Sequence, residues 1–214
     1  MKIKIAPSIL SADRTRLQEE VNEVEQYADL LHIDVMDGKF VPPKTFTPKE
    51  IKALKTRLIK DVHLMVVEPE NSFISDFIDA GAGIVTIHLE ACRDIRGAIN
   101  MIKDRGIKVG VSINPPTPLR TLLPYVDEID MALIMSVNPG YAGQSFIPSV
   151  LSKVRELRKL REKLDIQIDG GINKDTIKLA VEAGANIIVA GSAIFNSRDR
   201  KKAIEELRRA AEHG

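Results

Sequence analysis

The apolar run Leu30-Leu31-His32-Ile33-Asp34-Val35 (LLHIDV, 30–35) carries two ionisable side chains two positions apart. On a β-strand alternate residues point to the same face, so His32 and Asp34 would face one spot. A helix would separate them by about half a turn. Burying ionisable groups is costly unless they are paired or bind a metal. The segment therefore predicts a strand that presents a polar site.

Similar β-rich runs recur along the whole chain, with starts roughly 20 to 35 residues apart. They are IKIAPSI (3–9), LLHIDV (30–35), KDVHLMV (60–66), GIVTIHL (83–89), IKVGVSI (107–113), DMALIMSV (130–137), DIQID (165–169) and NIIVAGS (186–192). Amphipathic helical patterns lie between most of them, for example over 14–27 and 149–163. The fifth helical pattern, around 119–125, is short and flanked by prolines. Gly81, Gly106 and Gly184 fall where a helix would end before a strand.

Strict alternation of strands and helices implies a parallel sheet. Eight such units close most simply into a (β/α)8 barrel, or TIM barrel, so the expected fold class is α/β with residues 1–214 as a single barrel domain. An open doubly wound sheet is the alternative. That fold usually has a glycine fingerprint after its first strand, whereas this chain has Ser8-Ile9-Leu10-Ser11 there.

The amino-acid composition argues against some kinds of binding partner. The chain has 31 basic and 30 acidic residues, a net charge of +1 and no block of either sign, which argues against nucleic-acid binding. The single Cys92 excludes an internal disulfide and favours a reducing compartment. No apolar run approaches the ~18 residues that a membrane span requires. We expect a cytoplasmic protein with no nucleic-acid or membrane partner.

Barrel enzymes build their sites at the carboxyl ends of the strands, where this chain carries polar side chains. His32 and Asp34 belong to the second run, His63 to the third and Asp169 to the seventh. Two neutral histidine nitrogens and two carboxylates suit one divalent metal ion: zinc, iron(II), cobalt or manganese. A metal-free hydrogen-bonded cluster of the same residues is the alternative.

Glycine-containing segments follow the last three runs. They are NPGYAGQ (138–144), Asp169–Gly171 and Gly191–Ser192. Glycine lets backbone N–H groups approach an anion, and the apolar turn 193–195 could aim a helix N-terminus at it. Phosphate recognition at the last two loops recurs in barrels, so these segments predict a phosphate site.

Three methionines follow the polar strand ends. By alternation Met36 shares a face with Asp34 and Met65 shares one with His63, while Met135 ends the sixth strand. They could form an apolar wall that excludes water and perturbs the carboxylate pKa values. Filling gaps in the core is the alternative role.

A metal, two carboxylates and a phosphate grip suit proton abstraction next to the carbonyl of a sugar phosphate. Asp34 and Asp169 come from distant strands, so they would address opposite faces of a planar enediolate. One would remove the carbon-bound proton and the other would return one, which inverts the centre. The pattern predicts an epimerase.

From end to end the chain resembles the ribulose-phosphate 3-epimerase family. The matching segments are APSILSAD (6–13), LLHIDVMDGKFVP (30–42), DVHLMV (61–66), IHLEA (87–91), MSVNPGYAGQSFIP (135–148), DGGIN (169–173) and AGSAIF (190–195). The resemblance implies interconversion of D-ribulose 5-phosphate and D-xylulose 5-phosphate in the pentose phosphate pathway, by a homo-oligomer.

The resemblance also implies roles for individual residues. Asp34 is the proton acceptor and Asp169 the donor in one direction, and the metal ligands are His32, Asp34, His63 and Asp169. The implied substrate contacts are Ser8, His63, Gly140, Tyr141, Ala142, Gly143, Asp169, Gly170, Gly171, Gly191 and Ser192.

Three alternatives stay open. A D-allulose 6-phosphate 3-epimerase has similar motifs and a substrate one carbon longer. A metal-dependent lyase or decarboxylase usually needs a lysine or an extra acid at a strand end, whereas Lys60 and Lys108 open their strands. A non-catalytic sugar-phosphate-binding barrel would keep the same residues for stability alone.

Overall fold

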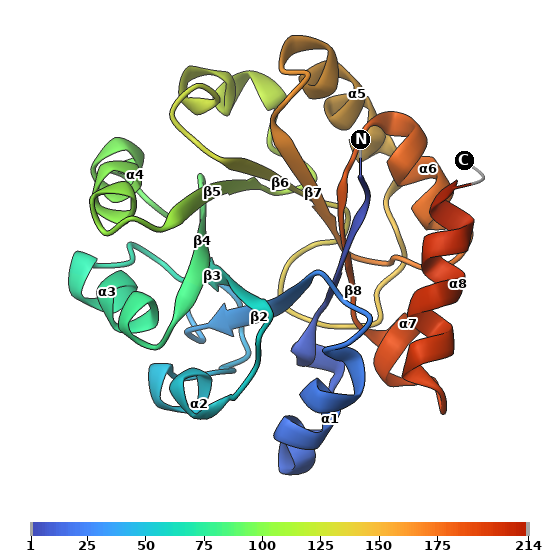
Figure 1. Cartoon of the computed structure of the whole chain (residues 1–214). Coiled ribbons are helices and arrows are strands. Elements are labelled where there is room, and N and C mark those ends of the chain that lie inside the picture. Colours follow the sequence, from blue (N-terminus) through green and yellow to red (C-terminus); the bar gives the residue numbers. More distant parts are fainter. Residues whose placement is uncertain (1, 213–214) are drawn as a thin grey trace.

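A ring of eight parallel strands occupies the centre of the molecule, in a computed structural model that describes residues 2–212 (Figure 1). The strands are β1 (Lys4–Pro7), β2 (Leu30–Met36), β3 (Ile59–Met65), β4 (Ala82–His88), β5 (Lys108–Ile113), β6 (Met131–Met135), β7 (Asp165–Asp169) and β8 (Ile187–Ala190). They pair in the order β1-β8-β7-β6-β5-β4-β3-β2. A parallel bridge between Ser8 and His32 joins the two ends of this sheet. The predicted (β/α)8 barrel is confirmed.

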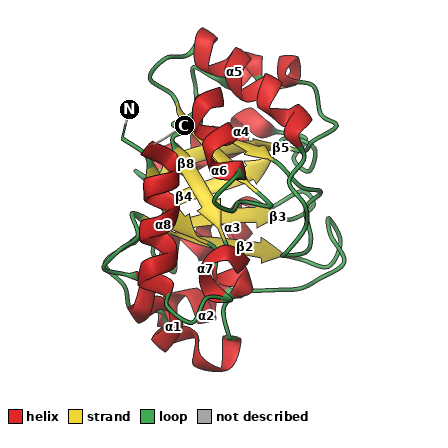
Figure 2. Cartoon of the chain, turned by 90° about the vertical axis from the view of Figure 1, so that its right-hand side faces the viewer, coloured by secondary structure: helices red, strands yellow, loops and turns green. Residues whose placement is uncertain are grey.

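Helices surround the strands on the outside (Figure 2). They are α1 (Leu17–Val24), α2 (Pro48–Ala53), α3 (Asn71–Asp79), α4 (Ile95–Asp104), α5 (Leu151–Leu160), α6 (Thr176–Ala183), α7 (Ser192–Phe195) and α8 (Arg200–Glu212). Two single 3-10 turns, Leu119–Thr121 and Leu123–Tyr125, take the place of a helix between β5 and β6. Pro124 has no N–H to donate, so a continuous α-helix is interrupted there.

Glycine ends the helices where the sequence predicts it. Gly81, Gly106 and Gly184 have φ of 94°, 71° and 110°, the left-handed conformation that closes a helix before the next strand. Thr47 begins α2 with a capping box, because its side chain accepts from Glu50 N while Glu50 accepts from Thr47 N.

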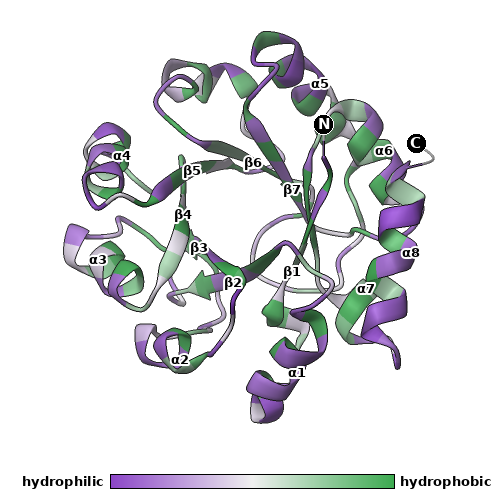
Figure 3. Ribbon diagram, in the orientation of Figure 1, coloured by the Kyte–Doolittle hydropathy of each residue, from purple (hydrophilic) through white to green (hydrophobic). Residues whose placement is uncertain are grey.

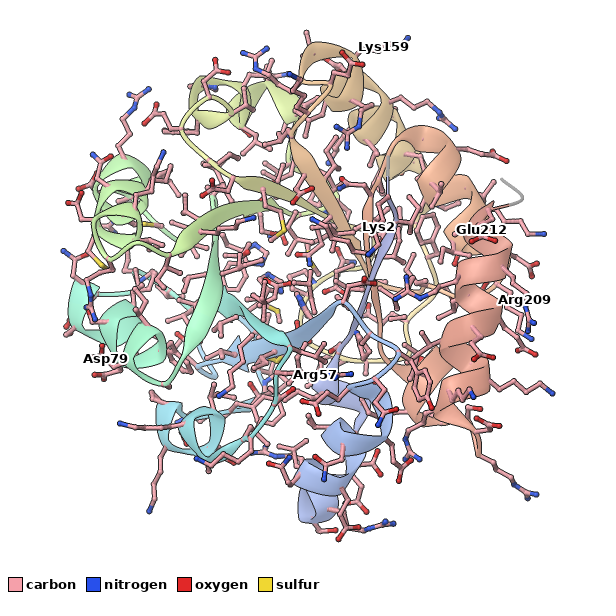
Figure 4. All side chains as sticks on the ribbon, viewed as in Figure 1. Lys2, Arg57, Asp79, Lys159, Arg209 and Glu212 are labelled. Carbon is pink, nitrogen blue, oxygen red and sulfur yellow. The ribbon has the colours of Figure 1, made fainter. Side chains whose placement is uncertain are left out.

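The hydrophobic core lies between the helix ring and the strands. Helix faces turned toward the barrel are apolar and the outer faces are polar (Figure 3). Ile33 and Val35 of β2 are fully or almost fully buried and belong to this core, as do Val21 and Val24 of α1. Labelled charged side chains such as Asp79 and Lys159 project outward from the helix ring (Figure 4). Burial of this apolar layer is the main force that holds the barrel together.

Inside the barrel, alternate residues of each strand point to the axis. A small apolar cluster fills part of this space: Ala6, Leu30, Ile84, Met131, Ile187 and Val189. Further along the strands the inward positions become polar, as at His32 and Asp34 on β2. The change from apolar to polar along the axis places the site at the carboxyl ends. Among residues 2–212, no helix combines the length and apolar character needed to cross a membrane.

Candidate active site

Three strands bring the predicted metal ligands to one point. His32 and Asp34 come from β2, His63 from β3 and Asp169 from β7, and one ligand atom of each lies within 4.8 Å of all the others. Asp34 and His63 are register partners in the β2–β3 pair, which places their side chains next to each other. The alternation expected for His32 and Asp34 therefore holds, since both point inward.

The distances within this cluster are short. Asp34 Oδ1 lies 3.3 Å from His32 Nε2 and 3.2 Å from His63 Nδ1. Asp169 Oδ2 lies 3.9 Å from His32 Nε2. His32 and His63 are fully buried, whereas 16% of the Asp169 side chain is exposed. The two histidines are thus shut off from solvent, whereas solvent reaches part of Asp169.

His32 points one ring nitrogen at the centre of the cluster. Its Nδ1 lies 2.8 Å from Asp61 Oδ2, and a carboxylate oxygen accepts, so Nδ1 carries the hydrogen. The other nitrogen, Nε2, is buried and has no hydrogen-bond partner among the residues that the structure describes. Gln167 Nε2 donates to the same Asp61 oxygen over 2.6 Å. Asp61 and Gln167 together hold the His32 ring, as outer partners of metal-binding histidines do.

This donor set fits a divalent metal ion. The histidines and the two carboxylates bring their donor atoms into one small volume, where the negative charges of Asp34 and Asp169 repel each other. A cation removes that repulsion, and mixed nitrogen and oxygen donors suit the borderline divalent metals.

The protein side chains alone shift the pKa values of the cluster in opposite directions. Burial lowers the pKa of His32, but the carboxylates of Asp34 and Asp61 outweigh it and raise that pKa well above its usual range. Burial raises the pKa of Asp34, but His32 and His63 outweigh it and lower the pKa far below the usual range. Burial and the negative charge of Asp34 raise the pKa of Asp169 to about 7. A bound divalent cation would lower the pKa of both carboxyls.

A pocket lies above the cluster at the mouth of the barrel. The predicted substrate contacts that line it are Ser8, Gly140, Tyr141, Ala142, Gly143, Asp169, Gly170, Gly171, Gly191 and Ser192. Met36, Met65 and Met135 line it too. His63 lies below the pocket floor, where it contacts Asp34, and is outside the lining. Gly191 precedes α7, so the predicted helical turn after it is present.

Ser8 and Asp34 are in direct contact at the floor of the pocket. The Ser8 hydroxyl donates to Asp34 Oδ2 over 2.5 Å. With Oδ1 facing the two histidines, both oxygens of Asp34 have fixed surroundings. The carboxylate is therefore held in one orientation.

Sequence reasoning missed several residues around the site. Asp61 lies two positions before His63 on β3, so strand alternation was a signal for its inward position. It also supplies the partner that the inward-facing Gln167 needs. His88 and Glu90 contact each other beyond His63, and their spacing of two positions at the end of β4 was a local signal for that contact. Lys60 points away from the mouth, since its Nζ donates to Ile51 O and Ala80 O.

The fold and the site define a class: a (β/α)8 barrel with a two-histidine, two-aspartate centre at the carboxyl ends of its strands. Solved structures with this fold cover nearly the whole chain. A 3-keto-L-gulonate-6-phosphate decarboxylase from Vibrio cholerae is 17% identical with a TM-score of 0.76, covering 100% of this chain and 99% of that one. A 3-hexulose-6-phosphate synthase is 21% identical with a TM-score of 0.72, covering 98% and 99%. At these identities the likeness concerns the fold alone.

Sequence comparison identifies the family. The model of the ribulose-phosphate 3-epimerase family matches residues 4–195. Ribulose-phosphate 3-epimerase of Bacillus subtilis is 48% identical, with 96% of this chain and 98% of the relative covered. The enzyme of Schizosaccharomyces pombe is 42% identical, with 97% and 93% covered. The chain belongs to the ribulose-phosphate 3-epimerase family.

Proposed function

We propose that this protein interconverts D-ribulose 5-phosphate and D-xylulose 5-phosphate by moving a proton at C3. The convergence of Asp34 and Asp169 with two histidines beneath a glycine-lined pocket carries the proposal. Relatives at 42% and 48% identity over nearly the whole chain bear the name of this activity.

The proposed metal ligands are His32, Asp34, His63 and Asp169, and the ion is zinc, iron(II), cobalt or manganese. When bound, such an ion supplies a positive charge that stabilises the enediolate. The rest of the chemistry falls to the side chains. Ser8 holds Asp34 by one oxygen and the histidines face the other, so the carboxylate keeps its direction toward the pocket.

Asp34 and Asp169 are the proposed acid/base pair. Asp34 removes the C3 proton from one face and Asp169 delivers a proton to the other, with the roles exchanged in the reverse reaction. They come from β2 and β7, which are separated in the ring by β1 and β8. Side chains from well-separated strands can flank a planar intermediate, which neighbouring residues of one strand cannot do.

Backbone groups of three loops are the proposed phosphate grip. These are the turns 140–143, 169–171 and 191–192, which all line the pocket. A Cβ on Gly191 would overlap Ser11 Oγ, at 2.5 Å, so a larger residue there would push the loop after β1. The proposed apolar wall, Met36, Met65 and Met135, excludes water beside the reacting carbon.

The proposal also covers the oligomeric state of the protein and its location in the cell. We expect a homo-oligomer in the cytoplasm, as the family resemblance and the single Cys92 suggest. Light scattering on the purified chain measures the oligomeric state directly, and a monomer at working concentration would contradict it.

A substrate comparison tests the proposed activity. Purified protein is assayed with D-ribulose 5-phosphate and with D-allulose 6-phosphate, and kcat/KM should favour the five-carbon substrate. In deuterated water the label should enter C3 without cleavage of a carbon–carbon bond. A preference for six carbons would change the substrate, and a cleaved product would refute the epimerase reaction.

A further inference from the structure

A chain of hydrogen bonds joins Glu90, which follows β4, to the proposed ligand His63. Glu90 Oε2 lies 3.2 Å from His88 Nδ1, and His88 Nε2 lies 2.8 Å from His63 Nε2. The two rings stack with their centroids 4.9 Å apart. On the other side of its ring, His63 Nδ1 lies 3.2 Å from Asp34 Oδ1. The two histidines thus form a relay from a carboxylate to the candidate metal centre.

Glu90 sets the direction of the protons in this relay. A carboxylate accepts hydrogen bonds, so His88 Nδ1 must carry the hydrogen. A neutral imidazole has one N–H, so His88 Nε2 accepts and His63 Nε2 must donate. In the metal-free protein Asp34 Oδ1, 3.2 Å from His63 Nδ1, competes from the other side for a hydrogen on that nitrogen. A cation bound by Asp34 would remove this competition, and the order set by Glu90 would leave the lone pair of His63 on Nδ1.

The surroundings of Glu90 keep it ionised and fixed. Its other oxygen, Oε1, accepts from Asn114 N over 2.7 Å and from the Thr117 hydroxyl. Burial raises the pKa of Glu90, but His88, Asn114 and Thr117 outweigh it and lower the pKa to about 2. Lys153 Nζ in turn donates to the carbonyl oxygens of Asn114 and Thr117. The far end of the relay is therefore anchored to the loop after β5.

We infer that Glu90 and His88 are positioning residues, which hold His63 in its Nε2–H tautomer and so keep Nδ1 free to bind the metal ion. Asp61 does the same for His32 through a single hydrogen bond. This inference rests on the proposed function, since it assigns His63 to a metal. Outer partners of this kind commonly change metal affinity by about 10- to 100-fold.

The tautomers can be read directly. The chain contains four histidines, so a long-range ¹H–¹⁵N spectrum of the uniformly labelled protein has few ring signals to assign. With zinc bound, we expect His88 as the Nδ1–H tautomer and His63 as the Nε2–H tautomer. A purely structural role for Glu90 would not fix these two states. His88 found as the Nε2–H tautomer would overturn the inference.

Glu90→Gln tests the relay by reversing it. The Asn114 N–H and the Thr117 hydroxyl, which donate to Oε1, favour the amide oxygen of the glutamine at that position. The amide NH₂ therefore faces His88 Nδ1. His88 then donates from Nε2, and His63 must carry its proton on Nδ1, where it blocks metal binding. We expect the zinc dissociation constant, measured by chelator competition, to rise about 10- to 100-fold.

Glu25→Gln is the matched control. Glu25 Oε1 also accepts from a threonine hydroxyl, Thr56, and from a backbone N–H, Arg57, each over 2.6 Å. It lies at the end of α1 and anchors the segment before β3, with no histidine in these bonds. We expect its zinc affinity to equal that of the wild type.

The outcomes separate the relay from the proposed metal site. A Glu90→Gln protein that binds zinc as tightly as the wild type overturns the relay. If urea titration shows that this variant does not fold, the tautomers of His88 and His63 in the wild type still test the inference. A wild type that takes up no divalent metal, with His88 as the Nδ1–H tautomer, supports the relay and contradicts the metal in the proposed function.

Discussion

Ser8 donates a 2.5 Å hydrogen bond to Asp34 across the seam where β1 meets β2 and the barrel closes. The backbone of Ser8 also forms the bridge to His32 at that seam. Closure of the barrel and orientation of the proposed acid/base residue therefore depend on the same position. Ser8, at the end of β1, thus contributes both to closure of the barrel and to the orientation of Asp34.

Ser8→Ala should lower kcat while leaving the fold intact. A hydrogen bond to a charged group contributes about 1.5–3 kcal/mol, and part of that loss would appear as a fall in kcat of about tenfold. Steady-state kinetics beside circular dichroism measure both effects. Ser152→Ala, on α5, removes a hydroxyl that donates to Ser149 O just before the helix, away from the pocket, and serves as the control. An unchanged kcat for Ser8→Ala would show that Asp34 needs no such support.

Asp34→Asn and Asp169→Asn should each abolish net epimerisation, because an amide cannot accept the C3 proton. General acid/base groups contribute about 10²- to 10⁴-fold, and we expect losses at least of that size. Each variant should still bind the sugar phosphate. Exchange of the C3 hydrogen with deuterated water is measured from both epimers, with metal content checked by elemental analysis. Wild-type exchange in a variant, from the epimer whose C3 proton the substituted residue is proposed to remove, would exclude that residue from the mechanism.

Removal of divalent metal should abolish activity and lower the thermal stability. Zinc, iron(II), cobalt or manganese should restore both, and magnesium, which prefers an all-oxygen site, should not. A ligand that binds only the folded state stabilises it by about 2.7 kcal/mol at 100 times its dissociation constant. Thermal melts with and without added metal measure this. Full turnover by protein shown to be free of metal would contradict the assignment.

The stability of the metal-free protein should depend on pH through Asp169. Its folded pKa, raised to about 7, lies above the ordinary value of 3.8, so the folded state binds the extra proton between these values. Relative to Asp169→Asn, the wild type should therefore gain stability as the pH falls from about 7 to about 4, by at most about 4 kcal/mol. Urea titrations of both proteins across this range measure the difference. A difference that stays constant with pH would show that Asp169 is not perturbed.

Gly171→Ala should be far more damaging than Gly143→Ala. Both glycines have positive φ, 66° and 77°, so alanine at either costs about 1 kcal/mol in backbone strain. A Cβ at Gly171 would also overlap the backbone of Phe146, whereas no described residue has an atom within 4 Å of a Cβ at Gly143. We expect a large loss of stability and a raised KM for Gly171→Ala alone. Equal effects would mean that the 169–171 turn relaxes freely.

The local pattern of the sequence determined the fold. The β-rich runs at 30–35 and 60–66 predicted two strands, which the structure has as Leu30–Met36 and Ile59–Met65, and periodic apolar residues predicted the helices around them. Eight alternating units leave few arrangements other than a closed parallel barrel. The two prolines at 118 and 124 predicted the short fifth helix, which is two 3-10 turns because proline cannot donate the helical hydrogen bond.

Strand alternation also indicated which ionisable residues point inward, and so which could share a metal. It could not indicate distances between residues far apart in the chain. Gln167 shows the limit, since its partner, Asp61, is 106 residues away. The same holds for His63, whose ring touches His88 25 positions later.

By itself, then, the sequence determined the barrel, the inward-facing candidate ligands and the glycine turns, because each depends on local conformation and on period-two burial. Only the tertiary structure decided that Ser8 holds Asp34, that Asp61 holds His32 and that Glu90 reaches His63 through His88. Those contacts depend on strand register and on the closure of the ring, which bring distant residues within hydrogen-bonding distance and which no local pattern encodes.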